Sequence, residues 1–135
     1  MSGSAASDLE ARAEAAQQRA YAPYSKFRVG ASLRAGGQIF DGANIENASY
    51  SLTICAERTA MAQAVLAGAH DLEEVAVCTD ASPPSSPCGA CRQFLYEFAR
   101  DPEAVKVTAV NGKGERRSWT LAELLPGGFS GRELP

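Results

Sequence analysis

The sequence has 135 residues, of which 45% are hydrophobic and 21% charged, and its formal net charge at pH 7 is −3. This length predicts one domain spanning residues 1–135, and the composition is that of an ordinary soluble globular protein. Two classes of protein are disfavoured. No apolar run approaches the roughly 20 residues of a membrane-spanning helix, and the acidic balance argues against binding nucleic acid through its phosphates.

The first residues, Met-Ser-Gly-Ser-Ala-Ala-Ser, contain neither the basic segment nor the apolar segment of a secretory signal. We therefore expect a cytoplasmic protein whose residues 1–6 are disordered. An alanine- and glutamate-rich helix is predicted over residues 7–20, because Ser7 and Glu10 have the spacing of a capping box.

The next segment alternates apolar and polar residues over 27–33, turns at residues 35–37 and resumes at 38–40, which predicts a β-hairpin. On this pattern alone, Phe27 fits an ordinary core residue of its strand. Residues 41–50 are polar and typical of a turn. Asn44 and Glu46 in that stretch fit either a solvated loop with local turns or, if the backbone is extended, a pair that binds a diol.

The remainder of the chain alternates between helical and strand patterns. We predict helices over 54–67, 88–100 and 120–125, and strands over 75–78, 105–110 and 115–119. With the hairpin, this order predicts an α/β fold: a three-layer α/β/α sandwich around one mixed sheet of about five strands. The helices that begin near residues 54 and 88 would then meet beside the sheet.

Three cysteines stand at the predicted starts of these two helices: Cys55, and the Cys-x-x-Cys pair Cys88 and Cys91. A catalytic zinc takes three protein ligands and leaves its fourth position to water, whose pKa it lowers. Glu57, two residues from a ligand, is placed to act as a general acid and base. Because three thiolates leave zinc with a net negative charge, compensating donors are expected from the helix N-termini and from arginines such as Arg92.

Two other interpretations remain. The fourth cysteine, Cys78, would complete a closed structural zinc site, or all four thiols would be buried without metal. Cys78 lies within an apolar strand, which favours a packed core thiol over a ligand.

The paired elements Cys55-Ala-Glu57 and Pro87-Cys88-Gly-Ala-Cys91 match the signature of zinc nucleoside deaminases. More widely, the chain resembles the small homotetrameric zinc-dependent cytidine deaminases. Five motifs carry that resemblance in one order: Tyr21-Ala-Pro-Tyr-Ser-Lys-Phe-Arg-Val-Gly30, Asn44-Ile-Glu-Asn-Ala-Ser-Tyr50, Cys55-Ala-Glu-Arg-Thr-Ala60, Ser86-Pro-Cys-Gly-Ala-Cys-Arg-Gln93 and Leu124-Leu-Pro-Gly-Gly-Phe129.

The resemblance implies a role for each matched position. One zinc per subunit would be held by Cys55, Cys88 and Cys91, and Glu57 would move the proton. The base would pack on Phe27 and the sugar hydroxyls would bind Asn44 and Glu46. The other implied roles are substrate contact by Ala56, contacts to a neighbouring subunit's site by Ala48, Tyr50 and Phe129, and hydrogen bonds to ligand sulfurs by Arg58 and Gln93.

The activity that these residues imply is hydrolytic deamination of cytidine and 2′-deoxycytidine to uridine and 2′-deoxyuridine, with release of ammonia, in pyrimidine salvage. The implied partners are a small nucleoside and three further copies of the chain, with shared active sites. Two alternatives remain: a deaminase of another aminopyrimidine, such as a blasticidin-type nucleoside or an RNA base, and a zinc-stabilised module that binds nucleosides without turnover. The acid Glu57 separates the enzymes from the binding module, which has no need of it.

Overall fold

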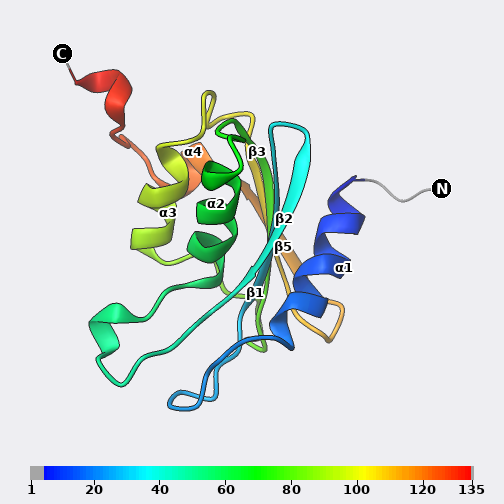
Figure 1. The fold of residues 1–135 in the computed structure, drawn as a ribbon. Helices are drawn as coiled ribbons and strands as arrows, with labels where there is room; N and C mark the ends of the chain where they lie inside the picture. The colour runs from blue at the N-terminus through cyan, green and yellow to red at the C-terminus, as the bar shows by residue number, and fades with distance from the viewer. Residues whose placement is uncertain (1–4, 135) are drawn as a thin grey trace.

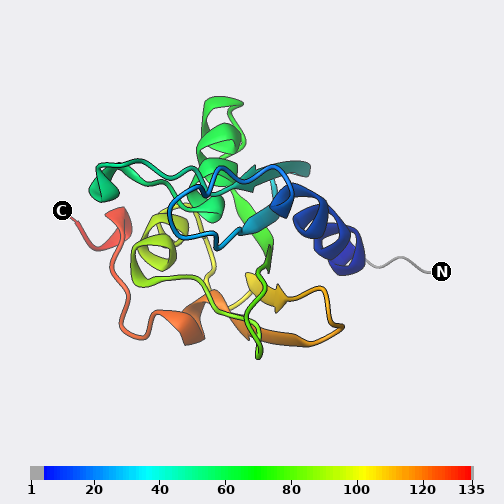
Figure 2. The same ribbon diagram turned by 90° about the horizontal axis from the view of Figure 1, so that it is seen from below.

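The computed structural model describes residues 5–134, which form a five-stranded mixed sheet with helices on both faces (Figure 1). Helix α1 (Ala5–Gln17) covers one face. The other face carries α2 (Ala56–Leu66), α3 (Gly89–Tyr96) and the short α4 (Leu121–Leu124). Seen from below, in Figure 2, α1 lies apart from these three helices, on the other side of the strands. The predicted three-layer sandwich is confirmed.

The sheet has the strand order β2-β1-β3-β4-β5. Only the central β3 and β4 pair in parallel, and every other neighbouring pair within the described residues is antiparallel. The five strands are β1 (Gly30–Ala35), β2 (Gln38–Ala43), β3 (Leu72–Cys78), β4 (Lys106–Val110) and β5 (Arg116–Thr120). Parallel pairing of β3 and β4 requires a crossover, and α3 lies in that crossover.

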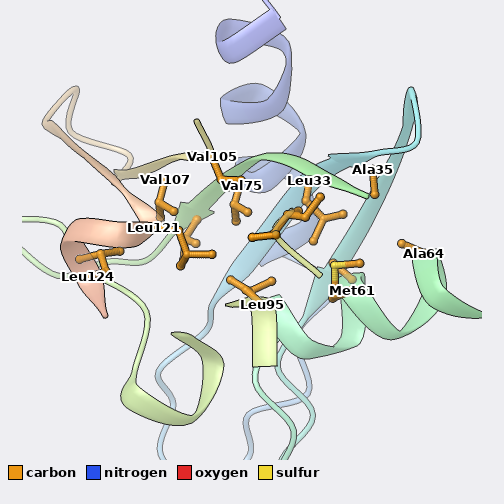
Figure 3. Packing of buried hydrophobic residues seen from close by; sticks show 14 of the residues in the cluster. Leu33, Ala35, Met61, Ala64, Val75, Leu95, Val105, Val107, Leu121 and Leu124 are labelled. Carbon is orange, nitrogen blue, oxygen red and sulfur yellow. The ribbon is translucent and has the colours of Figure 1, made fainter. Parts of the chain in front are cut away.

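The period-two pattern of the strands divides the core between the two faces of the sheet. Odd-numbered residues such as Leu33, Val75 and Val107 pack with Met61 of α2 and Leu95 of α3 (Figure 3). On the other face, Ala76 and Cys78 of β3 and Val110 of β4 form a second cluster with Leu9 and Ala13 of α1. Because the larger cluster holds α2 and α3 against the same face, the two cysteine-bearing helix starts come together.

Helix α1 approaches the sheet at Gly30. A Cβ atom at Gly30 would lie 2.1 Å from the carbonyl oxygen of Ala13, so the contact requires a residue without a side chain. From this position Gln17 reaches beyond the helix, and its Nε2 donates to the carbonyl oxygen of Arg28 at 3.2 Å and to Asp80 Oδ1 at 3.0 Å. Helix α1 thereby supports the loop before β1.

The expected boundaries shift in several places. Strand β1 begins at Gly30, not at Phe27, because the side chain of Asn44 binds the backbone groups of the preceding loop that a neighbouring strand would otherwise pair with. Val29 N donates to Asn44 Oδ1, and Asn44 Nδ2 donates to the carbonyl oxygen of Phe27, both at 2.9 Å. The helix that the sequence predicts to reach residue 100 ends at Tyr96 and continues in turns.

Three further differences concern short segments. Helix α1 starts at Ala5, so residues 5 and 6 are helical, whereas residues 1–4 of the segment expected to be disordered lie outside the described residues. Short 3₁₀ helices at Tyr50–Leu52 and Gly131–Glu133 are additional to the predicted elements.

Among residues 5–134, no helix is both long enough and apolar enough to cross a membrane.

Candidate active site

The sulfur atoms of Cys55, Cys88 and Cys91 meet where the first turns of α2 and α3 lie side by side. The Sγ atoms of Cys55 and Cys88 are 3.9 Å apart, those of Cys88 and Cys91 are 3.5 Å apart, and all three lie within 4.8 Å of one another. Tetrahedral zinc with Zn–S bonds of about 2.3 Å places neighbouring sulfurs about 3.8 Å apart. The cluster therefore has the dimensions of a three-thiolate zinc site.

The charge distribution in the cluster also fits a cation. Hydrogen bonds from the thiol of Cys91 and from Arg58 lower the pKa of Cys55 to about 5, whereas the same bond to Cys55, together with burial, raises the pKa of Cys91. The pair thus favours one negative charge and disfavours a second. Ionising all three thiols requires a positive ion between them, which is what Zn²⁺ provides.

Cys78 lies outside this cluster. It is fully buried in β3, and its thiol donates to Gln17 Oε1 at 3.3 Å. Burial raises the pKa of Cys78 to about 11, so it behaves as a neutral core thiol. None of the four cysteines forms a disulfide, and the position of Cys78 outside the cluster disfavours the four-cysteine alternative.

Arg58 and Arg92 were both expected to compensate the charge of the sulfurs, and Arg58 is the one whose hydrogen bonds within residues 5–134 include a sulfur. Arg58 Nη2 donates to Cys55 Sγ at 3.7 Å and to the carbonyl oxygen of Thr53 at 3.3 Å, while its buried Nε has no hydrogen-bond partner among the described residues. Arg92 instead binds around the loop before Cys88, donating to the carbonyl oxygens of Pro87 and Leu124.

The structure differs from the expectation at Gln93. Its Nε2 donates to the carbonyl oxygen of Phe129 at 2.9 Å, and none of its hydrogen bonds within residues 5–134 goes to a sulfur. The reason is that the C-terminal segment packs against α3. A Cβ atom at Gly128 would lie 2.7 Å from the ring of Tyr96, which brings the neighbouring carbonyl within reach of Gln93.

Glu57 is the second residue of α2 and only 4% exposed. Burial raises its pKa to about 7, and the charge of Cys55 acts in the same direction. A carboxylic acid with a pKa near neutrality can both accept and donate a proton at physiological pH.

This shift predicts a pH-dependent stability of the zinc-free protein. A carboxyl group whose pKa rises from 4.5 to about 7 on folding binds its proton more tightly in the folded state, so its contribution to stability is present below pH 4.5 and is lost as the pH rises to 7. In chelator-containing buffer, we expect Glu57→Gln to be more stable than the wild type by about 3 kcal/mol at pH 8 and equally stable at pH 4.5. Urea unfolding at both pH values measures this difference, and equal stability at pH 8 would contradict it.

A cavity of about 300 Å³ opens beside the sulfurs. Glu57, Cys55, Cys88 and Ala56 form one side of its lining, and Phe27 is among the residues that complete it. The sequence-predicted residues Asn44 and Glu46 also line it, together with Ser25, Val29, Thr53, Val77, Thr79, Ser85 and Ser86. A larger cavity of about 390 Å³ between α1 and β2 contains no cysteine or glutamate in its lining, so the chemistry belongs to the smaller one.

Asn44 and Glu46 both use part of their hydrogen-bonding capacity on the loop before β1. Asn44 binds the backbone on either side of residue 28, as described above, and Glu46 Oε1 accepts from the backbone N–H groups of Tyr24 and Ser25 at 3.0 and 3.1 Å. The hydroxyl of Ser25 donates to Glu46 Oε2. These bonds, that of the hydroxyl first, lower the pKa of Glu46, which is therefore a carboxylate at neutral pH.

Three expected substrate contacts lie outside the lining of this cavity: Ala48, Tyr50 and Phe129. Tyr50 is 73% exposed and its ring meets that of Tyr24 edge-on, with centroids 6.2 Å apart. Phe129 is 55% exposed, and its carbonyl oxygen accepts a hydrogen bond from Gln93 of α3. Within one chain, these three residues are therefore not part of the cavity wall.

Ser25 and Ser86 also line the cavity, and the sequence predicted no role for either of them. Each has a side-chain partner: Ser25 binds Glu46, and Ser86 Oγ accepts from Arg92 Nη2 at 2.7 Å. Serine is common in loops, so its type and position carried no signal of these contacts.

Comparison with known proteins agrees with the site. The model of the cytidine and deoxycytidylate deaminase zinc-binding region matches residues 4–109. A cytidine deaminase from Sporosarcina psychrophila is 49% identical over 127 residues, covering 93% of this chain and 92% of that protein, and one from Halalkalibacterium halodurans is 47% identical, covering 88% and 89%.

Solved structures show the same similarity. The crystal structure of cytidine deaminase from Burkholderia pseudomallei matches with a TM-score of 0.85 and 43% identity, covering 90% of this chain and 97% of that one. That of the Mycobacterium tuberculosis cytidine deaminase matches with a TM-score of 0.78 and 32% identity over 94% and 98%. By its matched zinc-binding region, its fold and its relatives, the chain belongs to the cytidine deaminase family of zinc-dependent hydrolytic deaminases.

Proposed function

We propose that the protein hydrolyses the exocyclic amine of cytidine and 2′-deoxycytidine, giving uridine or 2′-deoxyuridine and ammonia, in pyrimidine salvage. The observation that carries the proposal is the position of Glu57: a buried carboxylic acid that shares a cavity with Cys55 and Cys88 of the three-sulfur cluster. Three thiolates occupy three positions of a tetrahedral ion, so the fourth is open to water. A protein that merely bound nucleosides would have no use for the acid beside it.

In the proposed mechanism, Cys55, Cys88 and Cys91 would hold zinc, which would provide a water molecule of lowered pKa as the nucleophile. Glu57 accepts a proton from this water and delivers it to N3 of the pyrimidine ring, which makes C4 more electrophilic as oxygen adds. The same carboxyl then moves the second proton from oxygen at C4 to the amine, and ammonia leaves as the C4 carbonyl forms. Water and cytidine are consumed, and the carboxyl of Glu57 is regenerated.

Phe27 holds the base in this scheme. Its ring lines the cavity and is 41% exposed, so one face is available for an aromatic ring of the substrate. The loop that carries it is fixed by Asn44 and, through Arg28, by Gln17 of α1. A base packed on Phe27 would direct its C4 edge toward Glu57.

The remaining hydrogen-bonding capacity of Asn44 and Glu46 suits a sugar hydroxyl. Counting the bonds within residues 5–134, Glu46 has one acceptor position left, on Oε2, and Asn44 has one N–H left on Nδ2 and one acceptor position left on Oδ1. One hydroxyl that donates to Glu46 Oε2 and accepts from Asn44 Nδ2 would be bound by both residues. Because 2′-deoxycytidine is one of the proposed substrates, we expect this to be the 3′-hydroxyl and the 2′-hydroxyl to be dispensable.

The test is ammonia release by purified protein with cytidine, 2′-deoxycytidine and 2′,3′-dideoxycytidine, with zinc per chain measured on the same sample. We expect turnover of the first two with KM values within about three-fold of each other, and a KM at least about ten-fold higher for the dideoxy compound, because Asn44 and Glu46 are then left without a partner. Binding of cytidine without turnover would favour the binding module. Turnover of other aminopyrimidines in preference to cytidine would redirect the substrate assignment.

We further propose a homotetramer with shared active sites. Its support is the set of large side chains left exposed around the cavity and on the C-terminal segment, which includes Tyr50 at 73% and Leu52 at 63%. In such an assembly Ala48, Tyr50 and Phe129 would reach a neighbouring site. Light scattering on the assayed sample gives the oligomeric state. We also propose a location in the reducing cytoplasm, because the site needs Cys55, Cys88 and Cys91 as metal-binding thiolates and not as disulfides.

A further inference from the structure

The hydroxyl of Ser25 connects two groups of the nucleoside cavity. It donates to Glu46 Oε2, and it accepts a hydrogen bond from the backbone N–H of Phe27 at 2.9 Å. Ser25 and Glu46 are 21 residues apart in the chain, and both line the cavity. A single hydroxyl therefore joins the carboxylate that faces the sugar to the residue that packs on the base.

The contacts of the two carboxylate oxygens of Glu46 explain why this hydroxyl matters. Oε1 is held by the backbone N–H groups of Tyr24 and Ser25, which any residue except proline would supply at these positions. Among the described residues, Oε2 has the Ser25 hydroxyl as its partner. Rotation about the terminal torsion of glutamate has broad, weakly separated minima, so without the hydroxyl only the contacts of Oε1 restrain the direction of Oε2.

We propose that Ser25 is a positioning residue for sugar recognition: its hydroxyl orients the carboxylate of Glu46 so that the remaining acceptor position of Oε2 points at the sugar hydroxyl. This inference rests on the proposed nucleoside deaminase function. Ser25 acts through Glu46 and takes no part in the chemistry at C4, so its effect belongs to substrate binding and not to the rate of the bound complex.

The loop that contains Ser25 has other supports, so loss of the hydroxyl does not release it. Lys26 N donates to the carbonyl oxygen of Ala22 at 3.1 Å, and the side chain of Asn44 binds the loop at Phe27 and Val29. Ser25 is itself exposed, so alanine at this position creates no buried cavity. We expect Ser25→Ala to fold normally.

The experiment measures kcat and KM of wild type, Ser25→Ala and Ser25→Thr with cytidine and 2′,3′-dideoxycytidine, and repeats Ser25→Ala in a Glu46→Ala background. The control is Ser118→Ala, which removes a hydroxyl bonded to Thr108 on the exposed face of β5, away from the cavity. A second readout is the Kd of cytidine in the Glu57→Gln background, measured by calorimetry, which does not depend on turnover.

Ser25→Ala is expected to raise KM and Kd for cytidine about ten-fold, the loss of one charge-assisted hydrogen bond, and to change kcat by less than about two-fold. Ser25→Thr, which keeps a hydroxyl, should restore both constants. Ser25→Ala should leave the KM for the dideoxy compound unchanged, and it should cause no further rise in KM for cytidine in the Glu46→Ala background. The Ser118→Ala control should have the wild-type KM and Kd.

An unchanged KM and Kd for cytidine in Ser25→Ala would overturn the proposal, as would an equal rise for the dideoxy compound or a rise that persists without Glu46. If the wild type binds cytidine but releases no ammonia, the proposed function fails while the Kd series still decides on Ser25. If the wild type neither binds cytidine nor deaminates it, both fail.

Discussion

Replacing Glu57 by glutamine is expected to lower kcat for cytidine by on the order of 10⁴-fold while the protein keeps its zinc. Glutamine has nearly the shape of glutamate but cannot accept the proton of water or return it to N3 and to the amine. Because Glu57 lies in the second position of α2 and is 4% exposed, few other groups can replace it as a proton carrier. Ammonia release and zinc content on the same sample measure the two effects separately.

The control for this prediction is Glu103→Gln, which changes an exposed glutamate between α3 and β4. Its activity should equal that of the wild type. A Glu57→Gln protein that retains zinc and turns over cytidine at the wild-type rate would remove the proton-transfer role. A variant that loses zinc as well would show that Glu57 supports the metal cluster.

Replacing Cys88 by alanine is expected to abolish turnover by removing zinc. Cys88 is the exposed member of the cluster, so its side chain contributes little to the core, and its sulfur lies within 3.9 Å of both other sulfurs. Two remaining thiolates bind zinc far more weakly than three, because each ligand contributes to a tetrahedral site. Zinc per chain should fall from about one to near zero, with loss of ammonia release.

Cys78→Ala provides the matched control, since it removes a cysteine that lies in the α1-facing core cluster. It should keep zinc and activity, although the smaller side chain lowers stability by on the order of 1 kcal/mol. Chelation of the wild type should abolish activity, and added zinc should restore it. Loss of zinc in Cys78→Ala with retention in Cys88→Ala would reverse the ligand assignment.

Much of this architecture was predictable because local patterns carry it. Alternation of apolar residues identified the strands, and the spacing of Cys88 and Cys91 identified a metal-binding turn at a helix start. A helix was predicted over residues 120–125, and α4 forms there with a capping box at Thr120 and Glu123. The capping box predicted at Ser7 and Glu10 was wrong, since α1 already includes Ser7. These features depend on residues close together in the chain, where propensity and periodicity apply directly.

Phe27 shows where such patterns fail. Its alternation with the following residues predicts a strand, yet the side chain of Asn44 takes the hydrogen-bonding positions of that backbone and keeps Phe27 in a loop at the cavity. A side-chain amide from a distant segment overrides the local preference. The amide of Gln93 is similar, because the docking of the C-terminal segment on α3 decides that its partner is the carbonyl of Phe129.

The residue types and their spacing along the chain thus determined the fold class, the three candidate ligands and the acid beside them. Only the tertiary structure decided that the first turns of α2 and α3 bring sulfurs 33 residues apart to 3.9 Å, that Cys78 faces α1 instead, and that Ser25 meets Glu46. The physical reason is that contacts between distant segments follow from how helices pack on the sheet and from strand register. Neither is encoded in the short-range pattern from which elements are predicted.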